Sequence, residues 1–124
     1  MDREIILKLP LCSNNLLCAR LTTSAVCSLL NLNLDDSEDL KVCVNEACLL
    51  IMGQNYKVVR LVYNLGDTLT IGVYGEGVCD NPPKSIGEEE RELCVQLLNS
   101  LVDKVEYNKV GGIIESIMLV KRIN

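Results

Sequence analysis

The sequence predicts an α+β fold, a two-layer α/β sandwich with a mixed, mostly antiparallel sheet and three helices on one face. Strand patterns outnumber helix patterns, in the order β-α-α-β-β-α-β-β. Short turn-forming segments join two pairs of strands, as in β-hairpins. Each helix pattern has one apolar stripe, which suits packing on one face of a sheet. The length of 124 residues and the 48% hydrophobic content predict a single domain, 1–124.

The N-terminal half predicts one strand and two helices. Residues 4–9 have strand character and are ended by Pro10, and residues 13–29 suit a helix that Ser13 caps. A capping-box pattern with Asp35 as the cap begins the second helix, which ends at Gly53. The apolar stripe of this helix consists of Leu40, Val44, Ala47 and Ile51.

The C-terminal half predicts two hairpins with a helix between them. Residues 56–65 and 68–74 form the first hairpin, and residues 105–107 and 113–120 form the second. A second capping-box pattern, from Ser85 to Glu88, begins the third helix. The residues of this helix expected to face inward are Cys94, Leu97, Leu98 and Leu101.

Composition excludes several classes of function. Twelve basic and seventeen acidic residues give a net charge of −5, which argues against nucleic acid and against an anionic membrane as partners. The chain has no His, which excludes His-ligated zinc sites and His-based acid–base catalysis. The apolar run 47–53 is too short to span a bilayer, and residues 1–4 lack the form of a signal peptide.

The seven cysteines suggest a reducing compartment. None of them forms a Cys-x-x-Cys pair, and their number is odd, which is unsuited to a disulfide framework or a metal site. We expect small buried hydrophobic residues in a cytoplasmic protein. The seven cysteines are Cys12, Cys18, Cys27, Cys43, Cys48, Cys79 and Cys94.

Three segments resemble one known family. Residues 36–48, with the sequence DSEDLKVCVNEAC, are similar to the segment that carries the first nucleotide-binding box of the anti-sigma-factor serine-protein kinases. Residues 97–107 and 18–22 resemble two further segments of the same family. This family is a branch of the GHKL, or histidine kinase-like, ATPase superfamily, so the resemblance implies a Bergerat-type ATPase domain over nearly the whole chain.

The first nucleotide-binding box departs from the family pattern. The family has a catalytic Glu, which Glu46 matches, and a magnesium-binding Asn four residues later, where this chain has Leu50. A Leu side chain has no oxygen to offer a hard cation. The neighbouring Asn45 lies about 100° away around the helix and does not substitute. Glu46 is therefore expected to be a vestigial base or a solvated helix residue.

The other two boxes also depart from the pattern. In the adenine-binding box, Gly75 replaces the acceptor Asp and Cys79 replaces the last Gly, whereas Gly77 matches. Where the family has its glycine-rich phosphate-binding loop, this chain has Leu93 and Cys94 and no glycine. Close approach of the backbone to a phosphate is therefore lost. Four glutamates just upstream, within 88–92, would repel a triphosphate.

The resemblance therefore implies a retained scaffold without its chemistry. We expect an anti-sigma-factor-like regulatory protein that binds a sigma factor or a STAS anti-anti-sigma factor, with no cofactor and no metal. The resemblance assigns partner contact to Arg20. Family members dimerise through their sheet, and the strand over residues 4–9 has charge only at its ends, so a homodimer is expected.

Two alternatives from other classes remain open. One is an active ATP-dependent serine-protein kinase with an atypical site, in which Gln54 or Asn55 recruits magnesium. The other is a thiol-based sensor that uses Cys48, Cys79 or Cys94, although nothing electropositive in the sequence favours a low thiol pKa there.

Overall fold

The computed structural model describes residues 3–79 and 86–123. The predicted order of strands and helices is confirmed, with one short 3-10 helix added before the first α-helix. The elements are β1 (Arg3–Pro10), η1 (Ser13–Asn15), α1 (Leu16–Leu29), α2 (Leu34–Met52), β2 (Val58–Leu65), β3 (Thr68–Glu76), α3 (Glu88–Leu101), β4 (Lys104–Val110) and β5 (Ile113–Arg122).

The five strands form one sheet in the order β1-β2-β3-β5-β4. All four neighbouring pairs of described strands are antiparallel, so the expectation of a mixed sheet was wrong. The reason is topological. The helical hairpin of α1 and α2 returns the chain to β2 in the direction opposite to β1. Strand β5 then separates β4 from β3, the strand to which β4 runs parallel.

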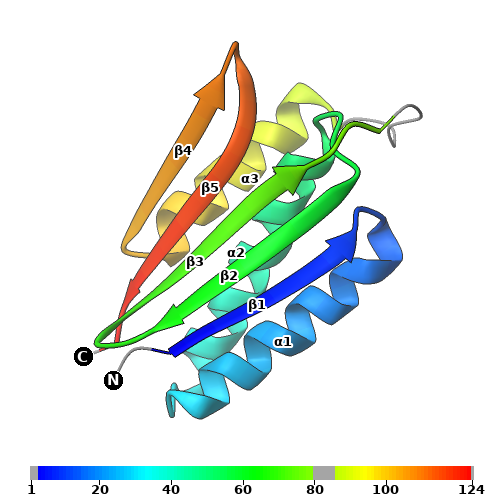
Figure 1. Cartoon of the computed structure of the whole chain (residues 1–124). Coiled ribbons are helices and arrows are strands. Elements are labelled where there is room, and N and C mark those ends of the chain that lie inside the picture. The colour runs from blue at the N-terminus through cyan, green and yellow to red at the C-terminus, as the bar shows by residue number, and fades with distance from the viewer. Residues whose placement is uncertain (1–2, 80–85, 124) are drawn as a thin grey trace.

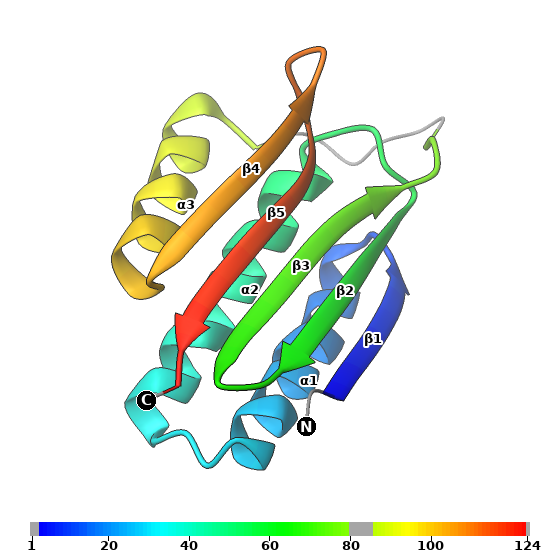
Figure 2. The same cartoon turned by 60° about the vertical axis from the view of Figure 1, so that its left-hand side comes forward.

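The three α-helices cover one face of the sheet and leave the other uncovered (Figures 1 and 2). Alternate residues of each strand point into the layer between sheet and helices, as a strand's period of two requires. In β3 these inward residues are Leu69, Ile71 and Val73, each 0% exposed. The predicted stripe of α2, from Leu40 to Ile51, is also fully buried in this core.

The predicted N-terminal helix caps were wrong, whereas Gly53 caps the C-terminus of α2 as expected. Asn33, not Asp35, caps α2, and its side-chain Oδ1 accepts a hydrogen bond of 2.8 Å from the N–H of Asp36. The helix begins at Leu34, so Asp35 lies in its first turn, where its charge interacts favourably with the helix dipole. Gly87 occupies the cap position of α3. Ser85 lies outside the described residues.

One buried hydrogen-bond network joins α1 to the sheet. The hydroxyl groups of Thr23 and Tyr63 lie 2.8 Å apart, and the Thr23 hydroxyl also donates to the carbonyl of Ala19 at 2.8 Å. Both side chains are 0% exposed, so this network satisfies polar groups that would otherwise be costly to bury. In the described part of the chain, no helix is both long and apolar enough to cross a membrane.

Candidate functional site

The residues matched to the nucleotide boxes come from α2, the end of β3 and α3, which meet at one end of the molecule. Glu46 and Leu50 lie one turn apart on α2, as predicted. Leu50 is only 1% exposed and belongs to the hydrophobic core. The position that in the family would present a metal ligand therefore carries an apolar side chain that packs inward.

Glu46 and Cys94 are brought together across the interface between α2 and α3. The thiol of Cys94 donates a hydrogen bond of 2.9 Å to Oε2 of Glu46. Burial, and after it the neighbouring Glu46 carboxylate, raise the pKa of Cys94 to about 12. Cys94 is thus a protonated donor at neutral pH, and it occupies one oxygen of the carboxylate that the family uses as a base.

Gly75 lies against the ring of Tyr56. The side-chain direction of Gly75 points into the helix-covered layer, and a Cβ placed there would overlap the ring carbons Cγ, Cδ2 and Cε2 of Tyr56. Any side chain at this position, including the adenine-binding Asp of the family pattern, is excluded while Tyr56 keeps its place. The aromatic ring fills the space beside the strand that such an acceptor would need.

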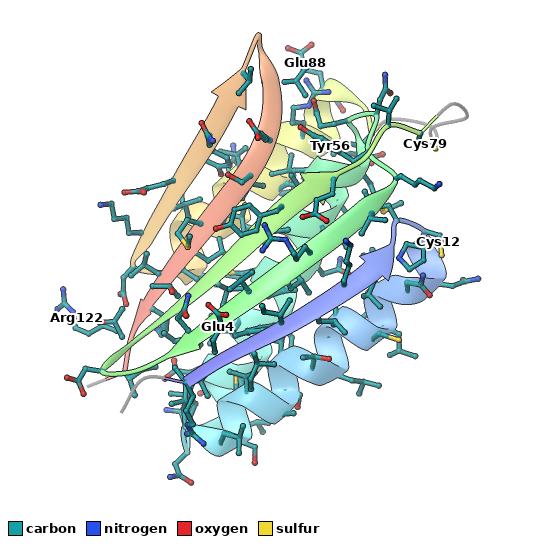
Figure 3. All side chains as sticks on the ribbon, viewed as in Figure 1. Glu4, Cys12, Tyr56, Cys79, Glu88 and Arg122 are labelled. Atoms are coloured by element: carbon teal, nitrogen blue, oxygen red, sulfur yellow. The ribbon has the colours of Figure 1, made fainter. Side chains whose placement is uncertain are left out.

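Gly77 and Cys79 continue the chain beyond β3. Gly77 has φ of +74°, a conformation that side chains other than glycine rarely adopt. The backbone N–H of Cys79 donates to the carbonyl of Asn55 at 3.0 Å, and Tyr56 and Cys79 lie at the same end of the sheet (Figure 3). The open cavity here has about 290 Å³ and is lined by Asn55, Tyr56, Gly77, Val78 and Ile113.

The remaining predicted residues do not line this cavity. Leu93 is 56% exposed on the outer side of α3. A larger surface cavity of about 320 Å³ runs along α3, lined by Arg91, Glu92, Val95 and Gln96. Gln54 donates its amide to the carbonyl of Leu50 at 3.5 Å, at the C-terminal end of α2. Of the matched residues within 3–79 and 86–123, only Gly77 lines the cavity at the end of β3.

Arg20 points across the helical layer. Its Nη1 donates a hydrogen bond of 2.6 Å to Oδ1 of Asn45, and the pair joins α1 to α2. Two large apolar side chains on the same helix, Leu17 and Leu21, are 52% and 60% exposed beside it. Arg20 is therefore half-buried and leaves part of its five-donor guanidinium for other contacts.

The cysteines divide into three groups by exposure. Cys27, Cys43, Cys48 and Cys94 are buried, as expected, whereas Cys79 is partly exposed and Cys12 and Cys18 are exposed. Burial raises the pKa values of Cys43 and Cys48 to about 12. Cys48 and Cys94, two of the three cysteines considered for a thiol sensor, are therefore held as unreactive thiols at neutral pH.

Sequence reasoning missed the role of Tyr56. A Gly within a strand pattern often marks close approach of another group, and Gly75 carried that signal. Gly75 was considered only as the residue in place of the acceptor Asp of the family pattern, which gave no reason to look for an aromatic neighbour.

Two comparisons with known proteins found no match. The sequence matches no protein-family model, and no curated protein matches it significantly. Within residues 3–79 and 86–123, no three His, Cys, Asp or Glu side chains gather as a metal-binding group.

Proposed function

We propose that this chain is an anti-sigma-factor-like regulatory protein with a GHKL-type scaffold, which binds a sigma factor or a STAS anti-anti-sigma factor without nucleotide binding or kinase activity. The resemblance of three segments supports the family, and the α+β architecture is compatible with it. The main support for the absence of nucleotide binding and kinase activity is Leu50. Its side chain packs into the core at the position that the resemblance matches to the metal ligand.

Two further contacts support the loss of nucleotide binding. Tyr56 excludes an acceptor side chain at Gly75, and Cys94 occupies the Glu46 carboxylate. A polar contact to a charged group contributes about 1.5–3 kcal/mol. Loss of the metal, adenine and phosphate contacts together would weaken a micromolar site by several factors of ten.

Calorimetric titration with Mg-ATP and Mg-ADP tests this part of the proposal. We expect no heat of binding and no thermal stabilisation at millimolar nucleotide. Saturable binding would overturn the proposal and favour the alternative, an active serine-protein kinase with an atypical site.

The outward side of α1 is the proposed partner surface. Leu17 and Leu21 present exposed apolar side chains on the same helix as Arg20. Burial of apolar surface drives association, and Arg is enriched among the residues that anchor interfaces. Because Asn45 already holds Arg20 in place, the guanidinium is pre-organised for such a contact.

Titration of purified sigma factors and STAS proteins from the same organism tests the partner surface. We expect Leu21→Asp to weaken binding at least tenfold. Leu93→Asp changes a similarly exposed leucine on α3 and serves as the matched control, with unchanged affinity expected. Absence of binding to every such protein, with or without nucleotide, would refute the proposed partner class.

A further inference from the structure

A separate cavity lies between α3 and the β4–β5 hairpin. It has about 170 Å³ and is lined by Arg91, Val95, Tyr107, Lys109 and Ile114. The cavity of about 320 Å³ along α3 adjoins it, because the two share Arg91 and Val95. The cavity at Gly77 has none of these described residues in its lining, so the two sites are distinct.

Two elements bring four of these side chains to one place. Arg91 and Val95 lie one turn apart on α3, so they share one face of the helix. Tyr107 and Lys109 are two residues apart on β4 and therefore point to the same face of the sheet. Tyr107 packs against the core, so this is the helix-covered face. The start of α3 and the turn of the β4–β5 hairpin lie at the same end of the molecule (Figures 1 and 2).

An irregularity in the pairing of β4 with β5 brings Ile114 to this face as well. Asn108 pairs with Ser116, but Lys109 pairs with Ile114, so β5 has one residue more than β4 at this point. This bulge reverses the alternation of β5, and Ile114 is only 7% exposed. Without the bulge, Lys109 would pair with Glu115, and a carboxylate would stand where the cavity has an apolar wall.

Two basic side chains give this cavity a charge opposite to that of the whole chain, which is −5. Among residues 3–79 and 86–123, neither Arg91 nor Lys109 takes part in an ion pair. A pocket with apolar walls and a few converging polar groups is the usual form of a small-molecule site. Cations without a carboxylate partner beside apolar walls suit an anion that has an apolar body.

The hydroxyl group of Tyr107 is a further polar group that lacks a partner. Its ring lines the cavity, whereas the hydroxyl is buried and has no hydrogen-bond partner in the part of the chain that the structure describes. A buried hydroxyl without a partner costs free energy. A ligand that brings an acceptor oxygen into the cavity supplies this partner once the ring turns toward it.

Size and charge restrict the class of ligand. An apolar cavity of about 150 Å³ accommodates benzene, so the cavity beside α3 has room for one ring or a branched chain of similar size. Four glutamates, at positions 88, 89, 90 and 92, flank Arg91 in sequence and repel multiply charged anions such as phosphate. A carboxylate carries one charge, and its two oxygens match the guanidinium fork of an arginine.

We propose that this cavity binds a small monocarboxylate whose apolar body is one ring or a branched chain. Arg91 binds the carboxylate, and Lys109 adds a second positive charge. Tyr107 donates its hydroxyl to a carboxylate oxygen, and the apolar part contacts Val95 and Ile114. The site has no residue in common with the proposed partner surface on α1, so it does not depend on the proposed function.

Titration with benzoate, phenylacetate and isovalerate, followed by backbone NMR spectra, tests the site. We expect at least one of them to saturate with a dissociation constant of about 1 mM or less, and the shifted signals to belong to α3 and the β4–β5 hairpin. Benzyl alcohol has a ring but no charge and should bind about tenfold more weakly or worse. Inorganic phosphate should not compete.

Four results would each overturn the proposal. They are absence of saturation by all three carboxylates, equally tight binding of benzyl alcohol, competition by phosphate, and signal shifts confined to the cavity at Gly77.

Substitution of Arg91 tests the charged contact against a matched arginine. Arg91→Gln should raise the dissociation constant about tenfold or more, because a charge-assisted contact is lost. Arg122 lies at the opposite end of the molecule from Glu88, which begins α3 (Figure 3). Arg122→Gln removes the same charge there and should leave the affinity unchanged. Equal effects of the two variants would show that only the net charge of the chain matters, which would refute a site at Arg91.

Two further variants separate the hydroxyl from the space. Tyr107→Phe removes an unsatisfied buried group, so the free protein should be at least as stable as the wild type, whereas the affinity should fall about threefold. Val95→Phe fills the cavity and should abolish binding while both basic residues remain. Undiminished binding by the Val95→Phe variant would contradict the location of the site, and undiminished binding by the Tyr107→Phe variant would contradict the role of the hydroxyl.

Discussion

Gly75 and Tyr56 show how one pair of residues restricts the chemistry at the end of β3. The missing side chain of Gly75 leaves room for the ring of Tyr56, and the ring in turn lines the cavity that contains Gly77. An Asp at position 75, the residue of the family pattern that the sequence resembles, would therefore meet the Tyr56 ring.

Gly75→Ala should destabilise the fold by about 1–3 kcal/mol, because the added methyl overlaps the Tyr56 ring in a packed layer. Urea unfolding measures this cost. In the double variant Tyr56→Ala/Gly75→Ala the overlap is gone, so the two costs should not add. Strict additivity would show that the ring does not occupy this place.

Thr23→Val should cost about 1–3 kcal/mol of unfolding free energy, because it removes the hydroxyl that lies 2.8 Å from Tyr63 Oη and leaves a buried phenol without its short hydrogen bond. Tyr63→Phe in the same variant removes the orphaned group as well. The double variant should therefore cost less than the sum of the single ones. Denaturation curves that give a simple sum would contradict the network.

At the scale of the elements, two residues stabilise the start of α2 in different ways, one by a hydrogen bond and the other by its charge. Asn33 accepts the N–H of Asp36, whereas Asp35 lies inside the first turn. A direct hydrogen bond survives high salt, but the interaction of an exposed carboxylate with the helix dipole is screened.

Asn33→Ala should therefore lower stability by about 1 kcal/mol at both low and high salt. Asp35→Ala should lose a few tenths of a kcal/mol at low salt and almost nothing at high salt. Chemical denaturation at two ionic strengths compares them. A larger cost for Asp35→Ala at high salt would restore the cap that the sequence pattern suggested.

At the scale of the whole molecule, the buried thiols make the free energy of unfolding depend on pH in the alkaline range. The pKa values of Cys43, Cys48 and Cys94 are about 12 in the folded protein, against an ordinary value of 9.0. The unfolded chain loses these protons first as the pH rises. The stabilisation is thus fully present below about pH 9 and is lost progressively between pH 9 and 12.

The free energy of unfolding should fall as the pH is raised above about 9, by up to about 1.4 kcal/mol per pH unit for each thiol. Urea titrations with a reductant present, from pH 8 to the onset of alkaline unfolding, measure the slope. Cys48→Ala should reduce the dependence of the unfolding free energy on pH by the contribution of one thiol. Burial also raises the pKa of Tyr63, which adds to the fall. A flat or rising profile would be inconsistent with buried thiols.

The local pattern of the sequence was enough for the type, order and approximate limits of the elements. Pro10 and Gly53 ended a strand and a helix where they were expected to, and the stripe of α2 is buried. Such features depend on residues a few positions apart, whose periodicity is visible in the chain itself. The resemblance, rather than this pattern, implied that Leu50, Gly75 and Cys94 stand where the family has nucleotide ligands.

What those positions do instead was decided by the tertiary structure. The bond from Cys94 to Glu46 spans 48 residues and that from Arg20 to Asn45 spans 25. Tyr56 meets Gly75 only because β2 and β3 pair in one register. Contacts of this kind depend on which faces meet when helices and strands pack, and no local periodicity encodes that. The sequence alone determined which residue types stand at positions 50, 75 and 94, and the packing determined which groups surround them.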